Sequence, residues 1–191
     1  MNKHHGPGAR KTQTNASRIQ AVLAALAETP NEIGRVARGR SDQRLHRRPQ
    51  VDAWSAQEIV AHLRACADVW GRSIDRMLAE DHPTIRYLSP RGWIGKTDYL
   101  QQSFGETLRA FAAQRAVLLT TLTKLSARHW TRGATFTGTT LGHEATVLSY
   151  ATRIADHEVR HLDQLRRTID SPLPTSAPPA GPAPLPRATS D

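Results

Sequence analysis

Two histidines four positions apart, His157 and His161, offer the clearest chemistry in this sequence of 191 residues. They lie in a segment whose apolar residues recur with a helical period. Side chains four positions apart share one face of a helix, with Cβ atoms roughly 5–6 Å apart. Two imidazoles at that separation can bind one metal ion through their ring nitrogens. Burying both rings without a shared partner would cost desolvation twice, so the pair indicates a metal site on a helix.

A third histidine, His62, lies far upstream in the apolar stripe of another helical segment. One histidine on an apolar face is more often a hydrogen-bonded core residue than a ligand, and that alternative stays open for His62. Three neutral imidazoles with one open position would form the kind of site that catalytic zinc uses. Nickel and iron accept the same donors, so the ligand types alone do not choose the metal.

The string from His157 to His161 also matches the H-E-x-x-H helix of zinc proteases. Proteases of this kind usually take a third ligand from a downstream segment. Here no glutamate follows Glu158, no H-x-x-G-x-x-H extension is present, and the chain continues into a proline-rich end. These features argue against a peptidase.

Three further residues could assist a metal site. Glu158 is the acid nearest the histidines in sequence, and it could serve as a catalytic residue that accepts a proton, or form a salt bridge with an arginine. Arg115 falls in an apolar stripe, where it could bind an anionic substrate group or pair with a carboxylate inside the protein. Cys66 follows His62 by one turn; it could be a fourth ligand, but a small buried core residue is the preferred interpretation.

Four helical stretches are expected to position these residues. In the first, apolar residues recur from Ile19 to Ala37, and Thr29-Pro30-Asn31-Glu32 resembles a capping box, so this stretch is either a kinked helix or two helices in line. The second opens with a capping box at Ser55–Glu58 and continues to Leu78. The third is expected from about Thr97 to Leu125. The fourth is expected from an N-cap near Thr140 to the Pro172 region.

The remaining segments are expected to be connections and tails. The long connection of residues 80–96 is of a length that is often functional in compact domains. Residues 131–139 are rich in Gly and Thr and capable of β structure, but we expect a loop, because no convincing strand alternation is present. The polar segment 1–14 and the Pro/Ala-rich segment 171–191 are expected to be disordered tails that flank one domain of residues 15–170.

Composition excludes several classes of protein. The net charge of +9 comes almost entirely from arginines scattered through the helical segments, which argues against nucleic-acid binding and for an arginine-rich surface. A single cysteine permits no intrachain disulfide, consistent with a reducing cytoplasm. No apolar segment resembles a secretory signal in residues 1–15, and no window approaches ~18 consecutive apolar residues, so we expect no membrane span.

The order and spacing of several short motifs resemble the DinB-like family. The motifs are Trp54-Ser55 followed by Glu58 and His62-Leu63, a proline in the first helix, and His157-x-x-x-His161-x-x-Gln164-Leu165. The resemblance covers roughly residues 16–169. It implies a four-helix bundle with a long crossover, and a metal triad of His62, His157 and His161.

The resemblance also implies a range of activities. Some members are similar to enzymes that use mycothiol or bacillithiol in transferase, isomerase or hydrolase chemistry, and many others have no assigned activity. Where the family often has aspartate after the first histidine of the fourth helix, this chain has Glu158. Glutamate keeps the carboxylate of aspartate on a side chain that is one methylene longer.

Together these features predict an all-α four-helix bundle with a long crossover connection and a kinked first helix. We expect a divalent metal ion, zinc or nickel before others, at a three-histidine site with an open coordination position. The leading hypothesis is a cytoplasmic, homodimeric metal-dependent enzyme that acts on a small molecule. It would be a thiol-dependent S-transferase or a hydrolase, with a low-molecular-weight thiol as one expected substrate. The alternative is a non-enzymatic bundle with a structural or vestigial metal site.

Overall fold

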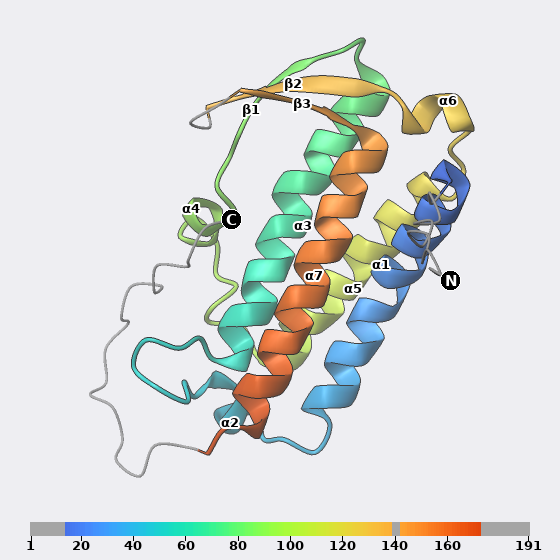
Figure 1. Ribbon diagram of the computed structural model, residues 1–191. Coiled ribbons are helices and arrows are strands. Elements are labelled where there is room, and N and C mark those ends of the chain that lie inside the picture. Colours follow the sequence, from blue (N-terminus) through green and yellow to red (C-terminus); the bar gives the residue numbers. More distant parts are fainter. Residues whose placement is uncertain (1–13, 139–141, 173–191) are drawn as a thin grey trace, which may run out of the picture.

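Four long helices form a bundle in the computed structural model, which describes residues 14–138 and 142–172. They are α1 (Asn15–Ala37), α3 (Ala56–Ala79), α5 (Phe104–Leu122) and α7 (Val147–Asp170). Helix α3 packs against α5 and α7, and α1 packs against the same two helices. In Figure 1, α1 and α7 run in one direction, and α3 and α5 run in the other. The predicted helical bundle is thereby confirmed.

The parallel direction of α3 and α5 explains the predicted long crossover. Because α5 starts at the end of the bundle where α3 also starts, the chain must return along its whole length (Figure 1). The crossover contains strand β1 (Thr84–Arg86) and the short helix α4 (Pro90–Ile94), which packs against α3. Short helices α2 (Asp42–His46) and α6 (Ala127–Trp130) lie in the other connections.

Side-chain caps fix where the long helices start. Helix α3 begins after Ser55, whose hydroxyl accepts a hydrogen bond from the Glu58 N–H while the Glu58 carboxylate accepts one from the Ser55 N–H. That predicted capping box is confirmed. The predicted starts of α5 near Thr97 and of α7 near Thr140 are wrong, because a capping box at Ser103 and a Thr146 cap begin these helices later.

The predicted capping box at Thr29 is also wrong. Helix α1 passes through Thr29 and Pro30 without a break, and the Thr29 hydroxyl donates to the carbonyl of Ala25 within the helix. The alternatives for this stretch were a kinked helix or two helices in line; a single continuous helix with Pro30 inside it is observed, and its kink stays a prediction.

A three-stranded sheet crosses one end of the bundle, where we had expected a loop (Figure 1). Strand β2 (Gly133–Thr137) is central, parallel to β1 and antiparallel to β3 (His143–Thr146). Ile85, Ala134 and Phe136 are buried against the helices, and Phe136 stacks on Tyr150 of α7. The sheet therefore closes the apolar core at this end.

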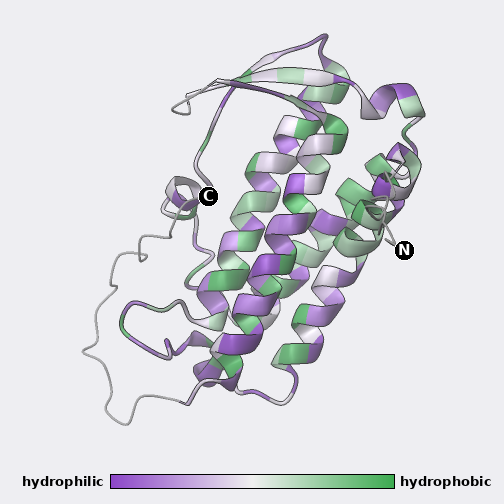
Figure 2. Ribbon diagram, in the orientation of Figure 1, coloured by the Kyte–Doolittle hydropathy of each residue, from purple (hydrophilic) through white to green (hydrophobic). Residues whose placement is uncertain are grey.

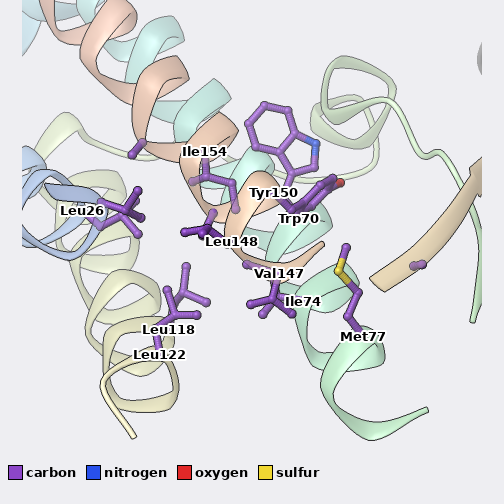
Figure 3. Packing of buried hydrophobic residues seen from close by; sticks show 14 of the residues in the cluster. Leu26, Trp70, Ile74, Met77, Leu118, Leu122, Val147, Leu148, Tyr150 and Ile154 are labelled. Atoms are coloured by element: carbon purple, nitrogen blue, oxygen red, sulfur yellow. The ribbon is translucent and has the colours of Figure 1, made fainter. Parts of the chain in front are cut away.

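A polar layer divides the core of the bundle into two apolar clusters. Figure 3 shows side chains of all four long helices meeting in the first cluster, next to the sheet. The second cluster fills the opposite half. Figure 2 shows polar residues on the outer faces of the helices, but buried polar residues also separate the two clusters along α1, α5 and α7, and His62 of α3 meets His157 of α7 at this level. These buried polar residues are Thr29, His62, Arg115, His157 and Glu158.

Two further expectations concern the ends of the chain and the membrane. The segments expected to be disordered, 1–14 and 171–191, lie outside the described residues except for positions 14, 171 and 172. Among the described helices, none combines the length and the apolar character that a membrane crossing requires.

Candidate metal centre

Three imidazoles from two helices converge in the polar layer. The Nε2 atom of His157 on α7 lies 3.3 Å from Nε2 of His62 on α3 and 3.1 Å from Nε2 of His161, one turn further along α7. His62 and His157 are buried, and His161 is half-buried. The structure thus brings together the three histidines that the sequence analysis singled out.

These distances fit a shared metal ion. Two nitrogen ligands at about 2.0–2.1 Å from a tetrahedral ion lie about 3.3 Å apart. Direct hydrogen bonds satisfy the arrangement less well, because Nε2 of His157 carries either one proton or one lone pair and faces two nitrogens. A cation among the three nitrogens would satisfy all of them at once.

The protonation states also suit metal binding. Burial, followed by the neighbouring His161 and Arg91, lowers the pKa of His62 to about 3. Burial and the neighbouring His161 and His62 lower the pKa of His157 to about 2, with smaller contributions from Arg160 and Arg153. Both rings are therefore neutral near pH 7, and neutral imidazole is the form that binds a metal.

The thiol of Cys66 adds a fourth donor to the cluster. Its Sγ atom lies 3.5 Å from Nε2 of His62, and the ligand atoms of His62, Cys66 and His157 all lie within 4.8 Å of one another. Sulfur and nitrogen ligands of one tetrahedral zinc ion lie about 3.6 Å apart. Cys66 is buried, as a core residue would be, so its position fits both of the roles considered from the sequence.

Gln164 orients the ring of His161. Nδ1 of His161 lies 2.8 Å from the Oε1 atom of Gln164, three residues later on α7. An amide oxygen only accepts, so Nδ1 carries the proton and Nε2 presents its lone pair to the cluster. The sequence analysis quoted Gln164 within a motif but gave it no role.

Two tryptophans pack against the imidazoles. Trp54 stacks parallel to His161 at 5.9 Å between ring centroids and meets His62 edge-on at 5.1 Å. Trp70 meets His157 edge-on at 4.7 Å. Both tryptophans are buried, so they restrict the rings and keep water away from one side of the cluster.

Arg115 and Glu158 form a buried ion pair with each other. Their side chains are each only 2% exposed, and the guanidinium of α5 contacts the carboxylate of α7. Burial raises the pKa of Glu158 to about 7, against the opposite effects of Arg115 and then Thr29. The internal pairing considered for each residue from the sequence is thus the contact observed, and the direct roles in proton transfer and substrate binding stay predictions.

A group of hydrogen bonds to Asp68 ties the crossover and α5 to α3. Asp68 of α3 accepts hydrogen bonds from Trp93 Nε1 at 3.0 Å, Tyr99 Oη at 2.7 Å and Gln114 Nε2 at 2.6 Å. Arg72 also lies over the ring of Trp93, 4.8 Å from its centroid. These contacts hold α4 in place beside α3, and the sequence analysis did not identify them.

The other histidines of the described chain lie elsewhere. His143, which the expected helix start near Thr140 would have placed in the fourth helix, is in strand β3 and stacks on Phe136. His82 pairs with Glu144 at 3.0 Å near the sheet.

The fold and family of this chain have known counterparts. The sequence profile of the DinB superfamily matches residues 17–165. The structure is similar to that of YfiT from Bacillus subtilis, described as a probable metal-dependent hydrolase with an unusual four-helix bundle topology. The TM-score is 0.67 and the sequence identity 18%, over 84% of this chain and 92% of YfiT, so the likeness concerns the fold. No curated protein matches the sequence.

Proposed function

This chain belongs to the DinB superfamily, and we propose that it is a metal-dependent enzyme that acts on a small molecule at the site of His62, His157 and His161. The observation that carries the proposal is the approach of three imidazole nitrogens to 3.3 and 3.1 Å in a buried layer. Zinc and nickel are the proposed ions, because both accept imidazole ligands.

Three protein ligands would leave a coordination position for the substrate. A divalent ion with such a position acts as a Lewis acid and lowers the pKa of a bound water or thiol. Hydrolysis is the reaction we propose first, because YfiT, with the same fold, is described as a probable metal-dependent hydrolase. Transfer of a low-molecular-weight thiol is the second reaction that the site could perform.

The neighbouring residues have positioning roles in this proposal. Gln164 holds the proton on Nδ1 of His161, which keeps the Nε2 lone pair directed to the ion. The Arg115–Glu158 pair joins α5 to the turn of α7 that carries His157. Glu158 would then act through the helix and not on the substrate.

A structural metal site is the second candidate function, and the position of Cys66 favours it. Closed zinc sites use four protein ligands, often including cysteine, whereas catalytic sites keep a position open. If Cys66 Sγ, 3.5 Å from His62 Nε2, completes the coordination, no position is left for a substrate. The two functions therefore differ in whether the thiol is a ligand.

An activity screen with matched variants tests the enzyme proposal. Zinc- and nickel-loaded protein is assayed against small esters and amides with water as nucleophile, and against small electrophiles with added thiols. We expect turnover that is lost after chelation, restored by metal, and absent in His161→Ala. His129→Ala, which removes an exposed histidine on α6, is expected to keep full activity. Turnover that survives chelation, or that His161→Ala retains, would refute the proposal.

A further inference from the structure

Two arginines flank the histidine cluster, each stacked on one of its tryptophans. Arg91 of α4 has its Cζ atom 5.3 Å from the centroid of Trp54. Arg153 of α7 has its Cζ atom 5.6 Å from the centroid of Trp70. Both arginines are half-buried. Each tryptophan thus contacts a guanidinium as well as at least one imidazole.

Neither guanidinium has a carboxylate partner within the described residues. The ion pairs found there use other arginines, such as Arg115. Nε of Arg91 is buried and lacks a hydrogen-bond partner among the described residues. A buried donor without a partner is costly, and a guanidinium offers a planar fork that matches a carboxylate or phosphate.

The acids that could neutralise these guanidinium groups have other partners. Glu158, next to His157 in sequence, contacts Arg115, and Asp68 accepts hydrogen bonds from Trp93, Tyr99 and Gln114, so neither acid contacts Arg91 or Arg153. Three neutral imidazoles would also leave the charge of a divalent ion uncompensated. The site would therefore carry the two positive charges of the ion and those of Arg91 and Arg153.

We propose that the ligand of this site is a small anion, and that Arg91 and Arg153 bind its carboxylate or phosphate group beside the metal. This inference rests on the proposed function, because it takes the histidine cluster to be the substrate site. The docking of α4 on α3 through Trp93 and Asp68 keeps Arg91 in place before a ligand arrives, so little ordering entropy is lost on binding. Arg91 would then decide the class of substrate and leave the metal ligands unchanged.

Binding of two molecules of similar shape, benzoate and neutral benzamide, tests the proposal. Calorimetric titration of zinc-loaded wild type is expected to show benzoate bound more tightly than benzamide. Arg91→Gln and Arg153→Gln should each weaken benzoate binding roughly ten- to hundredfold, the effect of one charge-assisted hydrogen bond, and leave benzamide binding as it was. Arg128→Gln removes the same charge from an exposed position on α6 and should change neither affinity.

The zinc content of each variant separates this proposal from the one it rests on. Equal benzoate affinity in wild type, Arg91→Gln and Arg153→Gln, each with full zinc content, would overturn the anion proposal alone. Zinc-loaded wild type that binds benzoate and benzamide equally, or binds neither, would overturn it as well. A wild type that holds no zinc would overturn the metal site itself.

Discussion

The buried Arg115–Glu158 pair permits a quantitative test of how the site is supported. Replacing only Glu158 by Leu leaves a guanidinium that is 2% exposed without its counter-charge. Removing one partner of a buried ion pair costs about 3–5 kcal/mol, whereas replacing both by apolar side chains is often neutral or stabilising. We therefore expect Glu158→Leu to lower the free energy of unfolding by about 3–5 kcal/mol. The Arg115→Met/Glu158→Leu double variant should be close to wild type.

The loss of stability caused by replacing Arg115 alone should depend on pH. The pKa of Glu158 is already raised to about 7 by burial, so the folded state binds this proton more tightly than the unfolded state does. A group with a raised pKa in the folded state stabilises the fold at low pH and loses that contribution as pH rises through the folded value. Arg115→Met should therefore cost little near pH 5 and most above pH 7. Near pH 5 Glu158 is protonated and gives Arg115 no counter-charge, so the loss of stability in Glu158→Leu should also be smaller near pH 5 than above pH 7.

Urea unfolding of the two single variants and the double variant measures the coupling. We expect a coupling energy of at least about 3 kcal/mol. The exposed pair of Arg166 and Asp163, 2.9 Å apart on α7, is the matched control, and its coupling should lie at about 0.2–1 kcal/mol. A coupling for Arg115 and Glu158 no larger than that of the control would refute the buried pair.

Three further predictions concern the surroundings of the metal site. The free energy of unfolding of metal-free protein should fall as pH drops below about 6.5, by up to about 2.7 kcal/mol per pH unit. The reason is that His62 and His157 become protonated near pH 6.5 in the unfolded chain, but only near pH 3 and 2 in the folded protein. A flat pH profile in chelator would contradict this. Cys66→Ser should leave zinc affinity unchanged if the site is open, and a large loss of affinity would instead indicate the closed structural site. Asp68→Ala removes the acceptor of three hydrogen bonds and should destabilise the protein by about 2–4 kcal/mol and speed proteolysis of the crossover; unchanged proteolysis would argue against its role there.

The helical faces and the histidine cluster could be predicted because both depend on a local period. His62 falls in the apolar stripe of α3, and His157 and His161 share one face of α7, so two stripes that pack together bring the rings into contact. The residues at which the helices start could be predicted less well. Apolar residues continue in phase before Ser103, so the pattern alone extended α5 too far toward the N-terminus.

The sheet and the charged contacts could not be predicted because they join distant segments. Strand β1 has three residues, too few to show alternation, and it pairs with β2 about fifty positions later in the sequence. The sequence left open whether Arg115 and Glu158 pair, because only the packing of α5 on α7 brings them together. The position of Arg91 similarly depends on how the crossover docks on α3.

Zinc content and X-ray absorption of the metal-loaded protein test the central claim most directly. The predicted result is one zinc per chain with three imidazole ligands at about 2.0–2.1 Å, and loss of zinc in folded His62→Ala, His157→Ala and His161→Ala but not in His129→Ala. A wild-type protein that binds no stoichiometric zinc, or triad variants that keep it, would contradict the claim that these three histidines share a metal ion.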